Sequence, residues 1–154
     1  MQEREIGMLE TVYVAHKTFE ELMTLFLCDI NDDDDYYDVI AYRLASRYRC
    51  QLESMLHLLS PKRLRAGISG IGMVGSRDSD GVIQPYLMHD DPMVVSASLD
   101  ALRLTGGCGW EHVSSLMSHQ SHFVRRSTTI CKEQTWEGFA FATDGCFERR
   151  SRDS

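Results

Sequence analysis

The chain has 154 residues, of which 43% are hydrophobic and 25% are charged, and its formal net charge is −7. This composition is ordinary for a soluble globular protein, and the excess of carboxylates argues against a nucleic-acid partner, because such binding needs Lys and Arg to neutralise phosphate. No apolar run approaches the roughly 20 residues that span a bilayer, and the N-terminal sequence, MQEREIGMLE, lacks the features of a signal peptide. We therefore expect one cytoplasmic domain over residues 1–154, with no membrane partner.

The cysteines give no sign of a disulfide framework. They are odd in number and irregularly spaced, without a CxxC pair, at Cys28, Cys50, Cys108, Cys131 and Cys146. Since cytosolic thiols are normally reduced, we expect small buried apolar residues or free thiols.

Two helices are predicted in the N-terminal part of the chain, before Ser60. Apolar residues recur at helical spacing over residues 3–28, with no proline and one early glycine. The acidic run at residues 31–35 interrupts this pattern, and Asp35 can then cap a second helix over residues 36–59. We expect the two helices to form an antiparallel hairpin.

A similar segment recurs in the rest of the chain. Residues 61–75 (PKRLRAGISGIGMVG) align with residues 92–106 (PMVVSASLDALRLTG), and their apolar or small positions coincide. A weaker third copy starts at Ser121, which aligns with Pro92 and brings Val124, Ile130 and Cys131 into register. A fixed period of about 30 residues predicts stacked structural units, which usually bind other macromolecules.

Both strong copies carry signals for the start and the end of a helix. Ser60 and Asp91 can each cap a helix, and each is followed by a proline, which has no N–H to leave unsatisfied in the first turn. Gly75 and Gly106 stand where these helices should end.

The sequence of these helices resembles a known repeat. In the short HEAT-like repeat of phycobilisome-lyase-type proteins, a D-P or S-P start is followed by V-R-x-x-A/S-x-x-A-L-x-x-[LI]-G. Residues 89–106 (HDDPMVVSASLDALRLTG) and 60–75 (SPKRLRAGISGIGMVG) fit this pattern, and residues 118–133 keep the V-R-R start. The resemblance covers about residues 60–134 and concerns the fold rather than an activity.

This resemblance implies an all-α fold, an α-solenoid of antiparallel helix pairs. A second, shorter helix completes each unit, over residues 82–88 and 111–117. On this interpretation, residues 1–59 are an N-terminal helical hairpin cap and residues 60–134 are the repeats. Residues 135–154 are a C-terminal cap with a frayed tail.

The acidic stretch DINDDDDYYDVI, residues 29–40, begins like a calcium loop. Asp34 stands where the sharp turn of that loop needs glycine, and Ile40 stands where a bidentate glutamate is needed. The open alternatives are a solvated loop, loose surface calcium binding, and a contact patch for a basic partner. Tyrosines beside carboxylates make good interface anchors. The candidate partner-binding residues are Asp32, Asp33, Asp34, Asp35, Tyr36, Tyr37, Asp78, Asp80, Asp90 and Asp91.

GIGMVG at residues 70–75 matches the dinucleotide fingerprint GxGxxG. That motif needs a strand before it and a helix after it, so that the pyrophosphate meets a helix N-terminus. A capped helix precedes it here instead, and Gly70 aligns with Ala101 of the next copy. We therefore expect these glycines to permit close packing between neighbouring helices.

Two other kinds of site are weaker candidates. His119 and His122 could share a helix face and bind a metal, but no carboxylate or cysteine pair stands beside them at a zinc-site spacing. HEAT-like DNA glycosylases bind DNA with a basic concave surface. Two groups of basic residues in this sequence align at equivalent helix starts and could form one basic ridge. In the middle copy, however, Val94, Val95 and Ser96 interrupt that ridge. The basic groups are Lys62, Arg63 and Arg65, and Arg125 and Arg126.

We expect a protein-binding module without catalysis, without a cofactor and without a nucleic-acid partner. Its most specific form is an acidic inhibitor of the immunity type, which binds and neutralises a basic toxin or enzyme. The alternative is a scaffold or adaptor subunit of a larger assembly. A metal-dependent or DNA-processing HEAT-repeat enzyme is a third class; the His-Glu dipeptides of HEAT-repeat hydroxylases are absent from this sequence.

Overall fold

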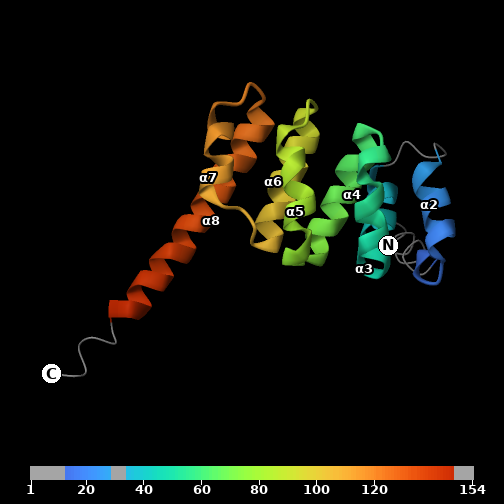
Figure 1. Ribbon diagram of the computed structural model, residues 1–154, viewed down its shortest axis with the longest axis horizontal. Coiled ribbons are helices and arrows are strands. Elements are labelled where there is room, and N and C mark those ends of the chain that lie inside the picture. The colour runs from blue at the N-terminus through green and yellow to red at the C-terminus, as the bar shows by residue number, and fades with distance from the viewer. Residues whose placement is uncertain (1–12, 29–33, 148–154) are drawn as a thin grey trace, which may run out of the picture.

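The computed structural model describes the backbone of residues 13–28 and 34–147, and the side chains of residues 13–28, 36–109 and 111–134. Within these ranges all regular secondary structure is helical, as predicted. The helices stand side by side in one row, from α2 at one end to α8 at the other (Figure 1). No helix in the described ranges is both long enough and apolar enough to cross a membrane.

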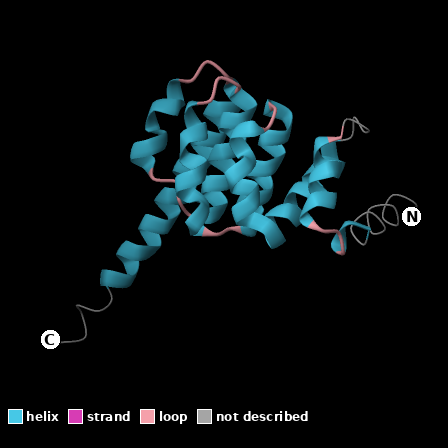
Figure 2. Ribbon diagram, turned by 45° about the vertical axis from the view of Figure 1, so that its right-hand side comes forward, coloured by secondary structure: helices cyan, strands magenta, loops and turns pink. Residues whose placement is uncertain are grey.

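Long helices alternate with short helical segments. The long helices are α3 (Asp34–Met55), α4 (Pro61–Val74), α6 (Pro92–Thr105) and α8 (His122–Phe147), preceded by α2 (Phe19–Leu27). The short segments are η1 (Leu56–Leu58), η2 (Arg77–Ser79), α5 (Asp80–Ile83), η3 (Gln84–Met88), α7 (Trp110–Val113) and η4 (Ser114–Ser118). The most extensive contacts join α3 to α4, α4 to α6 and α6 to α8, so each long helix packs on the one before it (Figure 2).

The predicted ends of the two strong copies are confirmed. Gly75 and Gly106 follow α4 and α6 with φ angles of 76° and 83°, the left-handed conformation that glycine adopts without steric cost. At the start of α6, the Asp91 carboxylate accepts a hydrogen bond from the Met93 N–H at 2.8 Å. Ser60 occupies the equivalent cap position before α4, but its hydroxyl makes no cap hydrogen bond there.

The third copy has a different register from the predicted one. Ser98 and Thr128 are both fully buried, and each hydroxyl donates to the carbonyl four residues earlier, at 2.8 Å. Those carbonyls belong to Val94 and Val124, which are also fully buried and therefore occupy equivalent positions. The predicted alignment is wrong by one position, because it matched Val124 with the apolar Val95 and not with Val94.

Residues 36–59 do not form the single straight helix that the sequence predicts. Helix α3 begins at Asp34, and Tyr48 interrupts it with non-helical angles of φ −133° and ψ 40°. The Arg47 guanidinium donates to the Ala15 carbonyl at 2.9 Å, and the Tyr48 ring meets Phe19 edge-on at 5.6 Å. A second helical stretch then continues through Met55 and η1 to Leu58. Residues 34–47 and 49–58 therefore repeat the pattern of a long and a short helix seen in the later units.

The predicted helix over residues 3–28 is also interrupted within the described residues. Thr18 begins α2 as its N-cap, and Thr18 and Glu21 exchange side-chain hydrogen bonds with each other's backbone N–H at 2.8 and 3.3 Å. This capping box is a local start signal that the apolar period concealed. The part of the prediction that covers residues 1–12 lies outside the described residues.

At the other end of the chain, α8 continues from His122 to Phe147. Residues 135–147, which the sequence analysis assigned to a C-terminal cap, thus continue α8. The last turns of α8 extend beyond the row (Figure 1).

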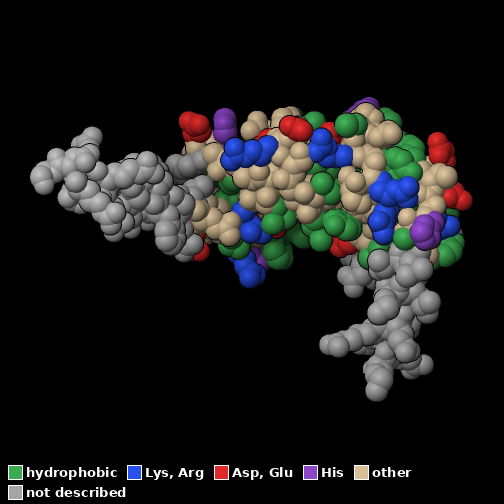
Figure 3. Space-filling model, turned by 90° about the horizontal axis from the view of Figure 1, so that it is seen from below, with side chains coloured by type: hydrophobic (Ala, Val, Ile, Leu, Met, Phe, Trp, Pro, Cys, Tyr) green, Lys and Arg blue, Asp and Glu red, His purple; other side chains and the backbone are tan. Residues whose placement is uncertain are grey.

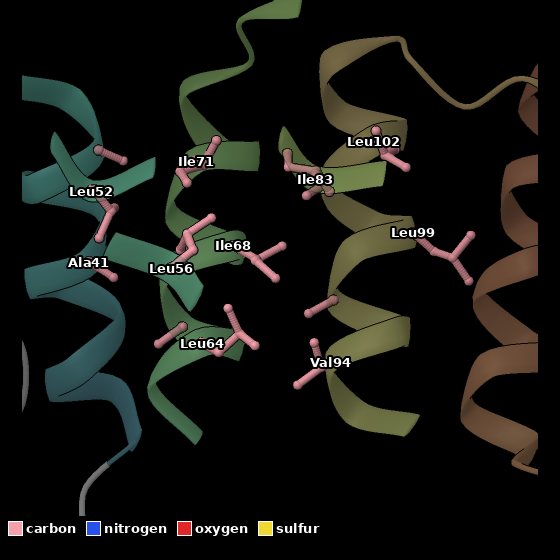
Figure 4. Packing of buried hydrophobic residues seen from close by; sticks show 14 of the residues in the cluster. Ala41, Leu52, Leu56, Leu64, Ile68, Ile71, Ile83, Val94, Leu99 and Leu102 are labelled. Carbon is pink, nitrogen blue, oxygen red and sulfur yellow. The ribbon is translucent and has the colours of Figure 1, made fainter. Parts of the chain in front are cut away.

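The hydrophobic core is continuous along the row. Figure 4 shows Ile68 pointing from α4 toward α6, and Leu99 pointing on from α6 toward α8. Both side chains are fully buried, and they occupy equivalent positions of the first two copies. Ile83 of α5 is also fully buried, so the short segments close the core beside the long helices.

Two of the three glycines of GIGMVG, Gly70 and Gly72, lie at these helix contacts, as predicted, whereas Gly75 ends α4. A Cβ atom placed on Gly70 would lie 2.7 Å from the Ala41 carbonyl carbon of α3. One placed on Gly72 would lie 2.6 Å from the Cα atom of Ala101 in α6. Real Cβ atoms essentially never come this close to atoms of another residue, so α4 needs glycine at both positions to approach its neighbours this closely.

Candidate interaction surface

The long helices begin along one edge of the row and end along the other. At the start of α4, the Arg63 guanidinium lies 4.5 Å from the ring centroid of Tyr37, in the first turns of α3. At the opposite ends of these helices, Arg77 follows α4 and Gly106 follows α6. The two residues are close neighbours, because a Cβ atom built on Gly106 would lie 3.2 Å from the Arg77 Nη2 atom. We call these the helix-start edge and the helix-end edge.

The predicted acidic residues are divided between the two edges. Asp90 and Asp91 precede α6 on the helix-start edge, whereas Asp78 and Asp80 follow α4 on the helix-end edge. The 14 residues of α4 separate these edges by about 21 Å at the usual helical rise. The four aspartates therefore do not form one surface.

The acidic loop is only partly described. Asp32 and Asp33 lie outside the described residues. The α3 backbone begins at Asp34, so Asp34 and Asp35 are placed on the helix-start edge. Helix N-termini favour nearby negative charge.

Three of the predicted aspartates have intramolecular partners. Asp91 caps α6 as described above, and the Asp80 carboxylate accepts a hydrogen bond from the Thr105 hydroxyl. Asp78 forms an ion pair with Arg49 at 3.4 Å, although its own side chain is 84% exposed. Asp90 is exposed, and it is the best placed of the four to meet a partner.

The two predicted tyrosines are packed against the protein. Tyr37 is only 3% exposed, and its hydroxyl donates to the Cys28 carbonyl at 2.7 Å. The expectation that Tyr37 anchors a partner at the surface is therefore wrong, because its hydroxyl and ring stabilise the contact between α2, α3 and α4. Tyr36 is half-buried and meets Tyr37 edge-on at 5.7 Å.

Exposed apolar side chains recur along the helix-start edge. Leu58 and Met88 end the segments η1 and η3 of successive units, and are 69% and 83% exposed. Met93 and Phe123 lie in the first turns of α6 and α8, again one unit apart, and are 37% and 46% exposed. Equivalent positions of successive units therefore present large apolar side chains to solvent.

A shallow depression of about 620 Å³ lies on the same edge, between the starts of α6 and α8, lined by Asp90, Pro92, Ser118, His119, Gln120 and Ser121. The Nδ1 atoms of His89 and His119 accept hydrogen bonds from the Asp91 and Ser121 N–H groups, both at 3.0 Å. These equivalent histidines thus order the turns that precede the two long helices.

The histidine pair proposed for a metal has other contacts. His119 uses Nδ1 as just described, and the His122 ring lies 3.9 Å from that of Phe123. Among the described residues, no three His, Cys, Asp or Glu side chains gather in a way that could hold a metal ion.

The helix-end edge is held together by polar contacts. Arg49 pairs with Glu53 at 3.5 Å, and the Ser79 hydroxyl donates to the same Glu53 carboxylate. Two exposed apolar side chains also occur there, Met73 and Leu104, which occupy equivalent positions of α4 and α6 and are 63% and 49% exposed.

The predicted basic ridge does not present all of its residues to solvent. Arg63 is 6% exposed and donates to the Leu27 and Cys28 carbonyls at 3.4 and 3.2 Å, so it satisfies the C-terminus of α2. Arg125 donates to the His119 and Gln120 carbonyls at 2.6 and 2.7 Å. On the face seen in Figure 3, Lys and Arg side chains lie in separate groups between neutral and hydrophobic ones.

Comparisons with known proteins do not identify the chain: no protein-family model, no curated protein and no solved structure matches it. The exposed apolar pairs of the helix-start edge were not among the predicted site residues. The sequence does carry a signal for them, since Leu58 and Met88, like Met93 and Phe123, are apolar residues separated by one repeat.

Proposed function

We propose that this protein binds a protein partner through its helix-start edge, without catalysis. We further propose that its row of helices is an α-solenoid of antiparallel, HEAT-like helix pairs, to which residues 34–58 contribute the first pair. The observation that carries the binding function is the recurrence of exposed apolar side chains at equivalent positions, Leu58 with Met88 and Met93 with Phe123. Exposed apolar groups of this kind on a polar surface favour a protein interface.

The charge of the chain suggests the class of partner. Asp90 is exposed on the helix-start edge, the backbone of Asp34 and Asp35 begins α3 there, and the whole chain carries a net charge of −7. Lys62, Arg125 and Arg126 are exposed at the same helix starts, so the negative balance is that of the chain as a whole. A net negative protein associates faster with a basic surface. The most specific form of the proposal is therefore an inhibitor of the immunity type that neutralises a basic toxin or enzyme.

A scaffold or adaptor subunit is the second candidate. Met73 and Leu104 place a further repeated apolar pair on the helix-end edge. Two separate apolar edges suit a protein that holds two partners at once.

The test is affinity capture of the tagged protein from its native lysate, followed by mass spectrometry and by binding measurements with the purified partner. The variant Met88→Asp with Phe123→Asp places charge on the helix-start edge. Met73→Asp with Leu104→Asp is the matched control on the helix-end edge. All four side chains are exposed, so both double variants should keep the helical content of the wild type.

We expect one stoichiometric basic partner, with binding lost only in the variant of the helix-start edge. Loss of binding only in the helix-end variant would refute the proposed edge. Two different partners, each lost in one of the double variants, would favour the adaptor.

A further inference from the structure

Exposed apolar side chains follow one another across three of the long helices, toward the helix-end edge. Tyr42 of α3, Met73 of α4 and Leu104 of α6 are 43%, 63% and 49% exposed. Each is separated from the next by one repeat in the sequence, and the three helices pack side by side (Figure 1). We call these three side chains the apolar ridge.

The helix contacts show that the three positions are structurally equivalent. A Cβ atom on Gly70 would meet the Ala41 carbonyl of α3, just as one on Gly72 would meet Ala101 of α6. Gly70 and Ala101 are equivalent positions of α4 and α6, so Ala41 and Gly72 are equivalent as well. The ridge residues that follow them therefore lie on the same side of neighbouring helices. Since packed helices lie about 8–10 Å apart, the ridge is about 16–20 Å long.

Arginines with unused hydrogen-bonding capacity lie beside the ridge. Arg43 and Arg77 form no ion pair with any described residue, and Arg77 connects the ends of α4 and α6, as described above. Arg103 lies 4.0 Å from Asp100, and its buried Nε atom donates to no acceptor in the described part of the chain. Asp38, one turn before the ridge in α3, already has a partner of its own. The ridge therefore suits a segment that is both apolar and acidic.

The first part of the chain has this composition. Residues 1–12, MQEREIGMLETV, contain three glutamates and one arginine. Apolar residues recur among them at intervals of three, which is the spacing of one helix face. These residues are Ile6, Leu9 and Val12.

The described chain starts close to one end of the ridge. The Ala15 carbonyl accepts a hydrogen bond from the Arg47 guanidinium at 2.9 Å. Arg47 follows Tyr42 in α3 by five residues, or about 7.5 Å along a helix. Twelve residues span about 18 Å as a helix and about 40 Å when extended. Residues 1–12 are therefore long enough to cover the ridge in either conformation.

We propose that residues 1–12 bind to the apolar ridge of the same chain. Their apolar side chains cover Tyr42, Met73 and Leu104, and their glutamates pair with the arginines beside the ridge. Because the segment is tethered close to its site, its effective concentration there is high. The bound segment covers the exposed apolar side chains of this edge, so a partner that binds there must displace it. Binding at the helix-start edge does not depend on this contact.

The test is amide hydrogen exchange of the full-length protein, measured by mass spectrometry of its peptides. In the wild type, residues 1–12 should exchange several-fold more slowly than an unstructured peptide of the same sequence. The double variant Met73→Asp with Leu104→Asp should bring them close to the unstructured rate. Met88→Asp with Phe123→Asp is the matched control on the opposite edge and should leave the segment protected. Peptides from α4 and α6 should exchange as in the wild type, because a local opening leaves the core intact.

Two further variants test the partners within the contact. Leu9→Asp should release the segment as the ridge variant does, and adding it to the ridge variant should have no further effect, because both remove the same interaction. Arg77→Gln should accelerate exchange of residues 1–12 at low salt and not at high salt, where charge pairs are screened. Arg126→Gln, at the start of α8, is its control and should leave their exchange unchanged.

Three results would overturn the proposal. The first is exchange of residues 1–12 at the unstructured rate in the wild type. The second is protection that persists in the ridge variant. The third is protection that increases with protein concentration together with dimer formation in light scattering, because the segment would then bind a second copy of the chain.

Discussion

Gly72 of α4 lies directly against Ala101 of α6, so closely that a methyl group on Gly72 would come 2.6 Å from the Cα atom and 2.7 Å from the Cβ atom of Ala101. The backbones of two successive units therefore approach each other through a glycine and an alanine. Neither helix can move closer, and neither residue can be enlarged without separating the units.

Gly72→Ala should destabilise the protein by about 1–3 kcal/mol, as overpacking of a close contact does. Chemical denaturation measured by circular dichroism gives the free energy of unfolding. Gly81→Ala is the matched control, because Gly81 is helical and a methyl group there meets nothing within 4 Å. That control should be neutral or slightly stabilising, and equal losses in the two variants would contradict the packing described.

Leu102→Ala should cost roughly 2–5 kcal/mol of unfolding free energy, because it removes buried methyl groups and leaves a cavity. Leu102 is 1% exposed, whereas Leu104, two residues later on the same helix, is 49% exposed. Leu104→Ala is therefore the control and should change stability by less than about 0.5 kcal/mol. A larger loss in Leu104→Ala than in Leu102→Ala would mean that the register of α6 is wrong.

Arg63→Met should destabilise the protein by about 1–3 kcal/mol, because the guanidinium no longer donates to the Leu27 and Cys28 carbonyls at the end of α2. Amide hydrogen exchange should become faster in α2 than in α6. Arg126→Met changes an exposed arginine and should leave both measurements close to the wild type. Unchanged exchange in α2 would show that Arg63 does not hold that helix in place.

The alkylation rate of Cys108 should rise with pH at a lower midpoint than that of a cysteine in an unstructured peptide, because its pKa is lowered by the Cys131 thiol and by Arg103. The thiolate is the reactive form, so a lowered pKa populates it at lower pH. Cys131→Ala removes the hydrogen-bond donor and should move the midpoint upward. Cys131→Ser keeps a donor and should move it less. A midpoint that is the same in all three proteins would exclude this hydrogen bond as the cause.

The sequence was informative where the signal is local. The apolar period predicted helices, the Asp91–Pro92 pair marked the start of α6, and Gly75 and Gly106 marked two helix ends. The all-helical composition and the register between the first two copies were predicted for the same reason. Each of these signals depends on the conformational preference of a residue and its near neighbours.

Contacts between residues far apart in the sequence decided the features of the fold that local signals did not predict. Tyr48 interrupts α3 although neither glycine nor proline occurs between Asp34 and Met55, and the contacts of this turn reach Ala15 and Phe19. The alignment of the third copy was wrong by one position, because it matched Val124 with Val95, whereas the buried hydroxyl of Thr128 occupies the position of Ser98.

The residues of the candidate interaction surface could also be predicted only in part from the sequence. By itself the sequence determined that the chain would be helical, repetitive and acidic, because these properties follow from residue type and spacing. Only the tertiary structure separated Asp78 and Asp80 from Asp90 and Asp91 and buried Tyr37. The direction and packing of the long helices decide which edge a residue occupies and which distant side chain it meets, and neither is encoded in the spacing of residues along the chain.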